Sequence, residues 1–281
     1  MIFVMVERMS IKDDLNTYEN VKEFLKFHAI SAVRLKIMII LFHGPQRTKE
    51  LKGLTGVESS SISHAIKNLE KEGIVSRKGD YFYLSELGEI LVPQLASIIK
   101  TQYVLKKFQR LWLDHTTEAI PQDLLMNIGD LSYSQFLESE PTDIYKTHEK
   151  HIQVVKGSKE LKGVSPIFYP IYTEVFNSII ENGVKVELIL TDEVLKRTLN
   201  SQEHGIEDMK KLLSTGNLTI WKIKDAKVAF TVTDKLMTLG LFLSNGMYDS
   251  NRLLVSDHND SLAWANKLFE YYRQKAEKFE L

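Results

Sequence analysis

The sequence predicts two folded parts: an α+β winged helix-turn-helix domain over residues 1–112 and an α/β mixed-sheet domain over residues 142–281. Helical patterns and one hairpin pattern follow each other in the first part, whereas helices alternate with strands in the second. The charge changes as well. There are 17 Lys and Arg against 12 Asp and Glu up to Trp112, and 19 against 25 after it. This asymmetry is typical of a nucleic-acid-binding domain fused to a domain of another kind.

Composition restricts the class of protein. The chain has 281 residues, of which 43% are hydrophobic and 26% charged, which is enough for two buried cores. It has no cysteine, so disulfides, thiolate catalysis and cysteine-ligated metals are excluded. Glu7 and Arg8 interrupt the apolar start, and the apolar run at residues 37–42 is too short to span a bilayer. We therefore expect a cytoplasmic protein that does not enter membranes.

The winged-helix pattern begins with a short helical segment at residues 21–27 and a stronger helix in SAVRLKIMIILFHG. Ser31 is a suitable N-cap, and Gly44-Pro45 is a stop signal. Apolar residues nearly encircle this helix, so we expect it to be buried on most sides.

Two shorter helices follow. In RTKELKGLTG, Thr48 is the expected N-cap, Leu51 and Leu54 are expected to point inward, and Gly56 ends the helix. In ESSSISHAIKNLEKEG, an apolar stripe leaves a polar face on the other side. The stripe consists of Ile62, Ala65, Ile66 and Leu69, and the polar face of Ser60, Ser61, Ser63, His64, Lys67 and Asn68.

A hairpin and a long helix complete the first part. Strand-like residues 74–77 and 81–84 flank Lys78-Gly79-Asp80, which is a tight-turn signal. A helix from Glu86 to about Trp112 follows, and we expect Pro93 to kink or split it.

This order of elements predicts binding to duplex DNA. A helix with small polar side chains can enter the major groove, while a basic hairpin contacts phosphates. Each element alone is equally typical of a solvated helix or an ordinary hairpin, and it is the ordered set that favours DNA. The expected DNA contacts are Thr48, Ser60, Ser61, Ser63, His64, Lys67, Arg77 and Lys78.

Residues 113–141 are expected to form a helical connector, and the α/β pattern begins at Thr142. Helices are predicted in DIYKTHEKHIQVVKGSKE, YPIYTEVFNSIIENG, DEVLKRTLN, GIEDMKKLLSTG and SLAWANKLFEYYRQKAEKF. Strands are predicted in LKGVSP, VKVELILT, NLTIWKI, KVAFTVTD, LMTLGLFL and RLLVSD. Alternation followed by consecutive strands indicates a mixed sheet.

The second part contains no convincing catalytic motif. No phosphate-binding glycine loop or nucleophile elbow is present. His148 and His151 stand three residues apart without a third metal ligand, so we interpret them as a surface pair. His148-x-Lys150 resembles the start of a phospholipase-type motif, but Val155 occupies the position of the required aspartate. We predict no catalytic residue, cofactor or metal.

Aromatic side chains near turns are the better candidates for function. Turns at strand ends commonly form the ligand crevice of an α/β sheet. A core-packing role is the alternative for each residue. The predicted ligand-binding residues are Phe168, Tyr169, Tyr172, Tyr248 and Arg252.

The stretch LKGLTGVESSSISHAIKNLEKEGIVSRKGDYFYLSELGEIL resembles winged-helix regulators of the MarR and ArsR type. The stretches GVSPIFYPIYTEVFNSIIENGVKVELILT, VTDKLMTLGLF and NGMYDSNRLLVS resemble a family of archaeal regulators found in methanogens and halophiles. This second resemblance implies an effector domain like the phospholipase-D-like sensor domain of TrmB-type regulators, without catalytic histidines. It also implies a homodimer that senses an unidentified small molecule.

Three functions are compatible with the sequence. The favoured one is a DNA-binding transcription regulator, not an enzyme, in which a small molecule bound to the second domain controls DNA binding. An enzyme that hydrolyses a phosphodiester or metabolite would retain activity without the winged helix and lose it in His148→Ala. A protein–protein adaptor would lack salt-dependent binding to non-specific duplex DNA.

Overall fold

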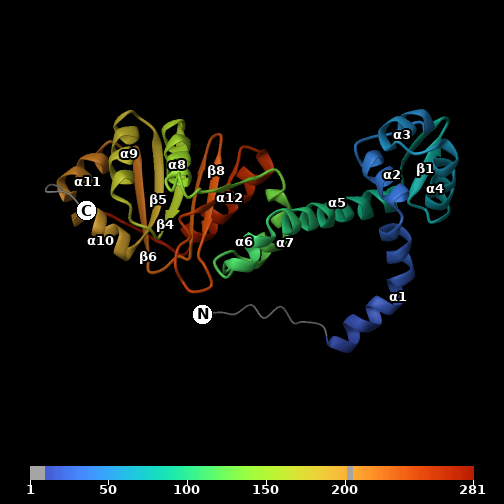
Figure 1. Cartoon of the computed structure of the whole chain (residues 1–281), viewed down its shortest axis with the longest axis horizontal. Helices are drawn as coiled ribbons and strands as arrows, with labels where there is room; N and C mark the ends of the chain where they lie inside the picture. The colour runs from blue at the N-terminus through green and yellow to red at the C-terminus, as the bar shows by residue number, and fades with distance from the viewer. Residues whose placement is uncertain (1–9, 201–204) are drawn as a thin grey trace. The chain divides into compact units, whose positions relative to one another are not determined.

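The structure is a computed structural model that describes residues 10–200 and 205–281 (Figure 1). The chain separates into two compact units, residues 1–97 and residues 98–281, and each unit has its own hydrophobic core. The apolar start of the sequence, together with Glu7 and Arg8, lies outside the described residues.

The first unit has the element order of a winged helix-turn-helix, as predicted. A single bridge between Gln46 and Phe82 places the segment before the third helix beside the hairpin. The elements are α1 (Ile11–Ile30), α2 (Ala32–Phe42), α3 (Thr48–Thr55), α4 (Ser59–Lys71), β1 (Val75–Lys78), β2 (Tyr81–Leu84) and the first half of α5 (Glu86–Lys107).

Helix α2 lies at the centre of this unit. The Ser31 hydroxyl accepts a hydrogen bond from the Arg34 amide at 3.4 Å, which confirms the predicted N-cap. Ile37, Met38 and Leu41 are buried, whereas Phe42 is 41% exposed. The expectation that α2 is buried on most sides was therefore too strong. Helix α1 is longer than the predicted segment at residues 21–27.

Helix α5 is continuous through Pro93. A proline removes only one intrahelical hydrogen bond, and Val92 and Leu95 on either side of it are anchored in the core of the first unit. The predicted break occurs instead at Phe108, whose backbone leaves the helical region. Val104 and Phe108, near the end of α5, belong to the core of the second unit. The two compact units divide between residues 97 and 98, whereas the sequence predicted a boundary at residue 112.

The second unit is a mixed α/β domain. Its short elements before the sheet core are the end of α5, α6 (Gln109–Asp114), α7 (Gln122–Met126), the 3-10 helix η1 (Ile128–Leu131) and β3 (Gln135–Glu138). Then come α8 (Lys146–Lys156), β4 (Glu160–Ser165), α9 (Pro170–Glu181), β5 (Lys185–Thr191), α10 (Asp192–Asn200), α11 (Gly205–Ser214), β6 (Leu218–Ile223), β7 (Val228–Thr233), β8 (Met237–Leu241), β9 (Arg252–Ser256), α12 (Asn259–Arg273) and β10 (Glu277–Lys278).

These strands form one sheet in the order β10-β6-β5-β4-β7-β8-β9-β3. β4, β5 and β6 are parallel, and the remaining pairs are antiparallel. The alternation along β5 sends Val186, Leu188 and Leu190 to one face and Ile189 to the other. The predicted mixed sheet is therefore confirmed.

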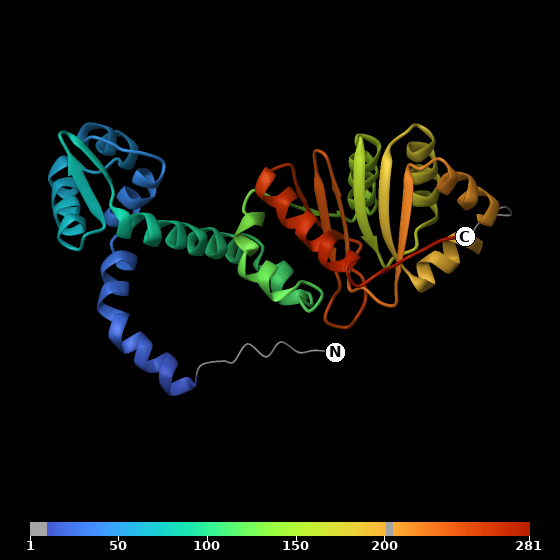
Figure 2. The same ribbon diagram turned by 180° about the vertical axis from the view of Figure 1, so that it is seen from behind.

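Helices cover both faces of this sheet. Helices α9, α10 and α11 pack on the face that carries Leu161, Val186 and Ile220. The long helix α12 packs on the opposite face, where Trp264 and Phe269 are fully buried. The two layers can be followed in Figure 1 and, from behind, in Figure 2, where α12 is drawn in red.

Two segments of the second unit differ from the prediction. The expected helical connector at residues 113–141 also contains β3, which pairs with β9 at the sheet edge. The closing helix was predicted to continue through Phe279, but α12 ends at Arg273, and Glu277–Lys278 pair with β6. Both short segments lack any strand pattern of their own and obtain their hydrogen bonds from a neighbouring strand. Within the described part of the chain, no helix combines the length and apolar character needed to cross a membrane.

Candidate nucleic-acid interface and candidate ligand cavity

Helix α4 buries one face and exposes a polar one. Ile62, Ala65, Ile66 and Leu69 are at most 5% exposed, as the spacing predicted. A hydrogen bond of 3.3 Å joins the Asn68 amide to Nδ1 of His64, four residues earlier on the same helix. The predicted contact residues on the exposed face are Ser60, Ser61, Ser63, His64 and Lys67. The structure thus places these five side chains together on one accessible surface.

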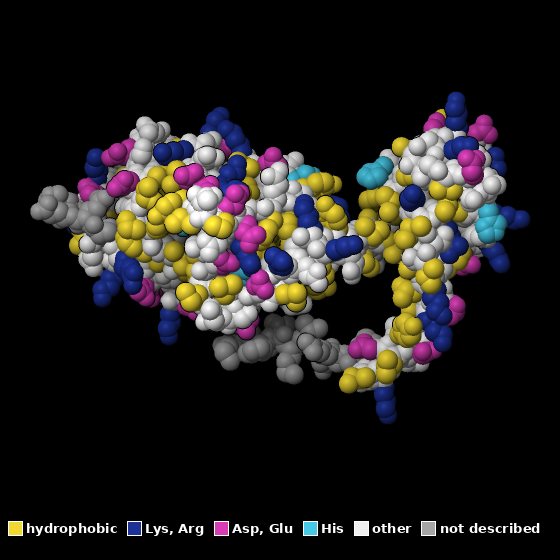
Figure 3. Space-filling model, in the orientation of Figure 1, with side chains coloured by type: hydrophobic (Ala, Val, Ile, Leu, Met, Phe, Trp, Pro, Cys, Tyr) yellow, Lys and Arg dark blue, Asp and Glu magenta, His cyan; other side chains and the backbone are white. Residues whose placement is uncertain are grey.

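The N-terminus of α4 has no side-chain cap. Glu58 occupies the cap position, and its carboxylate instead binds the Lys52 ammonium at 2.9 Å. The first backbone N–H groups of α4 therefore have no side-chain acceptor among the described residues, which suits an approaching anion. Lys and Arg side chains project from the surface of this unit in Figure 3.

The predicted role of Thr48 as an N-cap is wrong. Thr48 is the first residue of α3, and the cap is Arg47, whose amide donates to the Glu50 carboxylate at 2.6 Å. Leu54 was expected to point inward, but it is 64% exposed. Leu51 is fully buried, and Gly56 ends α3 in the left-handed conformation, as predicted.

The hairpin β1–β2 carries two exposed basic residues, Arg77 and Lys78. The Arg77 Nε donates to the Gly79 carbonyl at 2.8 Å, and its guanidinium lies 5.4 Å from the centre of the Phe82 ring. Arg77 is therefore held against the hairpin, and Lys78 is exposed beside it.

The second unit contains a cavity between its sheet and the helices α8 to α11. Its empty volume is about 1130 Å³, including the mouth. All five predicted ligand-binding residues line it, although they come from segments far apart in the sequence. These are Phe168, Tyr169, Tyr172, Tyr248 and Arg252. Their role in binding a ligand stays a prediction.

Small side chains leave room above the middle of the sheet. Gly163 on β4 pairs with Leu188 on β5 and with Thr231 on β7. Ile220 pairs with Leu188, and Thr238 pairs with Thr231, so these residues form one row across five strands. The row changes from apolar on β6 and β5 to hydroxyl-bearing on β7 and β8.

His148 and His151 face this cavity, so the interpretation as a surface pair was wrong. His148 Nδ1 lies 2.8 Å from the Tyr172 hydroxyl, and its ring stacks on Tyr169 at 4.6 Å. His151 Nδ1 lies 3.3 Å from the Thr238 hydroxyl. The signal in the sequence was the position of His148 on the same helix face as Ile152 and Val155, which pack in the core.

Burial keeps these groups neutral near pH 7. Desolvation lowers the pKa of His148, and desolvation together with the neighbouring His148 lowers the pKa of His151 to about 4. Burial also raises the pKa of Tyr172, and it raises the pKa of Tyr248 to about 12. Imidazoles and phenols at this wall therefore act as uncharged hydrogen-bonding groups.

Tyr248 is held close to the sheet by a glycine. A Cβ atom at Gly240 would lie 2.4 Å from the Tyr248 hydroxyl, so only glycine lets the ring occupy this position. Tyr248 also packs edge-on against Phe242 at 5.5 Å. The wall formed by Tyr248 is consequently fixed to β8.

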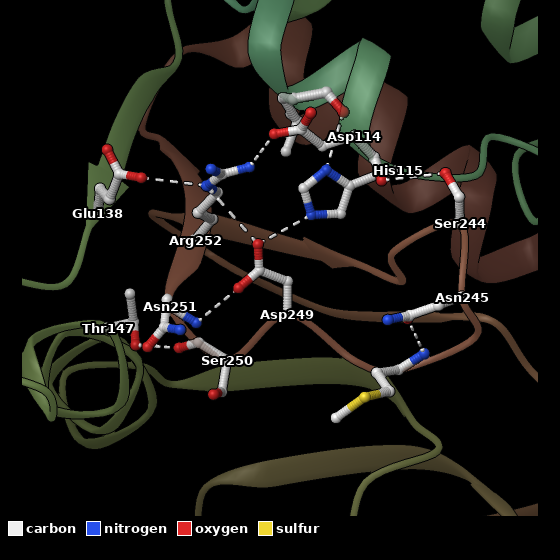
Figure 4. A network of polar contacts seen from close by, with 12 residues as sticks. Asp114, His115, Glu138, Thr147, Ser244, Asn245, Asp249, Ser250, Asn251 and Arg252 are labelled. Atoms are coloured by element: carbon white, nitrogen blue, oxygen red, sulfur yellow. Dashed lines mark hydrogen bonds and ion pairs between the residues drawn. The ribbon is translucent and has the colours of Figure 1, made fainter.

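Arg252 is already paired with carboxylates (Figure 4). Its Nη1 binds Asp114 at 2.5 Å, its Nε binds Glu138 at 3.1 Å, and Asp249 lies 3.7 Å from Nε. The guanidinium beside Asp114 holds the pKa of that carboxyl below its usual range. Arg252 thus joins the cavity wall to the end of α6.

A buried pair that the sequence did not indicate lies next to Arg252. His115 Nε2 binds the Asp249 carboxylate at 3.0 Å, and His115 Nδ1 lies 2.8 Å from the Leu111 carbonyl. On the other side, the Thr147 hydroxyl donates to the Ser250 carbonyl at 2.6 Å. The segment at residues 248–252 is therefore anchored both to α6 and to α8. No spacing signal could have found this contact, because residues 115 and 249 are brought together only by the fold.

Metal ligation has no support in the described residues. No group of three or more His, Asp or Glu side chains within residues 10–200 and 205–281 is arranged to hold an ion. The two cavity histidines instead use their Nδ1 atoms for protein hydroxyls.

The fold and the two sites define a class of two-domain protein, in which a winged helix with a polar helix face is followed by an α/β domain that encloses a cavity. Residues 22–102 match the model of the N-terminal domain of methanogenesis regulatory protein FilR1, and residues 144–275 match that of its middle domain. The chain is therefore similar, over these two segments, to the N-terminal and middle domains of FilR1 regulatory proteins.

A curated relative shows the same similarity. The methanogenesis regulatory protein FilR1 of Methanothrix harundinacea (strain 6Ac) is 26% identical over 258 residues, which cover 91% of this chain. The match spans 58% of the relative, so this chain corresponds to little more than half of that protein.

Solved structures with partial similarity include TrmBL2, an archaeal chromatin protein with a described mode of DNA binding. It is 15% identical, with 93% of this chain and 99% of that chain covered, at a TM-score of 0.42. The adhesin competence repressor AdcR of Streptococcus pyogenes is 18% identical, with 36% and 84% covered, at a TM-score of 0.24. Both scores lie below 0.5 and do not establish a shared fold.

Proposed function

We propose that the protein is a transcription regulator that binds duplex DNA through α4 and the β1–β2 hairpin. The observation that carries this proposal is the polar face of α4, which exposes Ser60, Ser61, Ser63, His64 and Lys67 together, with Glu70 at its edge. Such a helix fits the major groove, where these side chains reach base edges and phosphates. Arg77 and Lys78 on the hairpin would contact the adjacent backbone, and Thr48 at the start of α3 would contact a phosphate.

We also propose that the protein works as a homodimer. Apolar side chains on α1 and α5 support this, because large ones are exposed in both helices. A monomeric soluble protein rarely leaves rows of such side chains uncovered. The most exposed are Ile11 at 79%, Ile30 at 74%, Ile90 at 65% and Leu15 at 61%.

The α/β domain is proposed to sense a small molecule in its cavity rather than to catalyse a reaction. The cavity wall that carries Tyr248 continues into Asp249 and Arg252, which bind α6. A ligand that binds more tightly to one position of this wall would favour one position of α6. It would thereby favour one conformation of the dimer over another. The phospholipase-D-like description of this domain stays a proposal, supported by its mixed sheet with helices on both faces. We place the protein in the cytoplasm, where its DNA target is.

The test measures binding to the duplex upstream of the protein's own gene. Fluorescence anisotropy of the labelled duplex gives the affinity at each salt concentration of a series. Because the relative is a methanogenesis regulator, promoters of that process are the next candidates. Lys67→Ala and Arg77→Ala should each weaken binding about tenfold and reduce the salt slope by about 1.

The matched control is Lys210→Ala, which removes an exposed lysine from α11 in the other unit. It should bind like the unsubstituted protein. If both head variants bind as tightly as the control at every salt concentration, the assignment of α4 and the hairpin to DNA is wrong.

A further inference from the structure

The cavity of the α/β domain has almost no charge. Among the described residues that line it, Arg252 is the only one with a permanently charged side chain. Its guanidinium is engaged by Asp114 and Glu138, which are not part of the lining. An anionic ligand would therefore lose its hydration without gaining a free cation, which is costly in a largely apolar site.

The lining is graded from apolar to polar. Under α10 and α11, the cavity is bounded by Val194, Met209 and Leu212, opposite Ile220 and Leu188 on the sheet. All five are hydrophobic, and the hydroxyl of Thr198 on α10, which also lines this end, donates to the Val194 carbonyl at 2.9 Å. A ligand body placed here would be stabilised by burial of its own apolar surface.

The other end, under α8, is rich in hydrogen-bonding groups. His148 and His151 each use Nδ1 for a protein hydroxyl, and the described residues supply no partner for either Nε2. If the Tyr172 hydroxyl donates to Nδ1 of His148, the ring proton lies on Nε2, which then becomes a donor. A hydroxyl or carbonyl oxygen of a ligand could accept that hydrogen bond.

We propose that the cavity binds an uncharged amphiphile, with its apolar body under α10 and α11 and one hydroxyl or carbonyl end beside His148, His151 and Tyr172. This inference rests on the proposed sensing role of the α/β domain. It excludes sugar phosphates, nucleotides and carboxylates as preferred ligands.

The experiment uses the full chain and the neutral fluorescent probe N-phenyl-1-naphthylamine at pH 7.5. The probe should brighten on binding and be displaced by 1-decanol. Decanoate has the same chain length but carries a charge, and it should need a concentration at least about tenfold higher. Glucose 6-phosphate should not displace the probe.

Two variants locate the ligand. Tyr172→Phe removes one hydroxyl and should weaken 1-decanol about fivefold, while probe binding changes less than about twofold. Val194→Phe narrows the apolar end and should weaken both. Tyr271→Phe, on the α12 face of the sheet, is the matched control and should change neither.

The outcomes separate this inference from the proposed function. Displacement by decanoate at equal or lower concentration than 1-decanol, or displacement by glucose 6-phosphate, would overturn the neutral-ligand inference. A chain that binds duplex DNA but no probe would overturn it as well, with the DNA-binding proposal intact. A chain that binds probe in the expected order but no duplex would retain the ligand inference and refute DNA binding.

Discussion

In the winged-helix unit, five of the proposed contact residues lie on α4 alone, and their common surface follows from helical spacing. In the α/β unit, the cavity is lined by residues from four helices and several strands, and its polar end joins α8, α9 and β8. The surface of the first unit is therefore decided by local sequence. The cavity of the second is decided by which distant segments pack together, and its properties depend on tertiary structure.

The largest expected effect tests whether the two units are stabilised separately. Trp264 is fully buried on α12, and its indole N–H donates to the Leu124 carbonyl at 3.0 Å. Trp264→Ala should destabilise the α/β unit by about 3–5 kcal/mol, because it leaves a cavity and an unpaired carbonyl. Calorimetry should show a lowered transition for this unit and an unchanged transition for the winged helix.

The matched variant is Leu69→Ala in α4, which should lower only the transition of the winged helix. If Trp264→Ala lowers both transitions equally, the chain unfolds as one cooperative body and the comparison of two units fails. Trp264→Phe, with a smaller loss of volume, keeps the test usable should the alanine variant not fold.

The second prediction concerns the buried pair at the wall of the cavity. His115→Ala removes the partner of the Asp249 carboxylate and of the Leu111 carbonyl. We expect a loss of about 1–3 kcal/mol, because at least one of these buried acceptors loses its imidazole donor. Chemical denaturation of the α/β transition measures it.

His64→Ala is the control, since His64 is exposed on α4. It should leave stability unchanged and affect DNA binding alone. If the His115 and His64 variants are equally stable, the contact between residues 115 and 249 does not contribute to the stability of the α/β unit.

The two units also differ in how much of their functional surface the sequence could predict. Helical spacing placed Ile62, Ile66 and Leu69 correctly, because a helix face is fixed by the neighbouring residues. The cavity aromatics could be proposed from their positions beside turns. His151 could not, since its contact with Thr238 depends on strand pairing across the sheet. The error at Thr48 has a local cause: Glu50 caps the helix from inside, so the hydroxyl is not needed.

The cavity histidines should make the stability of the α/β unit depend on pH. The folded pKa of His151 is about 4, below the value of about 6.5 for an unfolded histidine. The unfolded chain therefore takes up the proton first, and stability that is complete above pH 6.5 is lost as the pH falls toward 4. We expect the melting temperature of the α/β unit to fall by about a few degrees between pH 7 and pH 5.

His148 shifts in the same direction and should add to this loss. His151→Asn retains a polar group toward Thr238 but does not titrate, so its α/β transition should be less sensitive to pH. The difference between the two proteins reports on His151, because all other titratable groups are the same in both. An α/β transition equally steep in wild type and His151→Asn would place the origin elsewhere.

The smallest effects test whether local backbone conformation decides the stability of the winged-helix unit. Gly53 and Gly56 lie three residues apart in and after α3, and neither would clash with an added Cβ. Gly56 has φ of 68°, a region that costs a side-chain-bearing residue about 1–2 kcal/mol, whereas Gly53 is helical. Gly56→Ala should therefore destabilise the unit by about 1 kcal/mol, and Gly53→Ala should stabilise it by about 0.5–1 kcal/mol. Opposite shifts of the winged-helix transition, with the α/β transition unmoved, are the expected result. Shifts of the same sign would mean that packing around α3, rather than backbone conformation, decides the stability of this unit. The winged-helix unit would then depend on tertiary packing, like the cavity of the α/β unit.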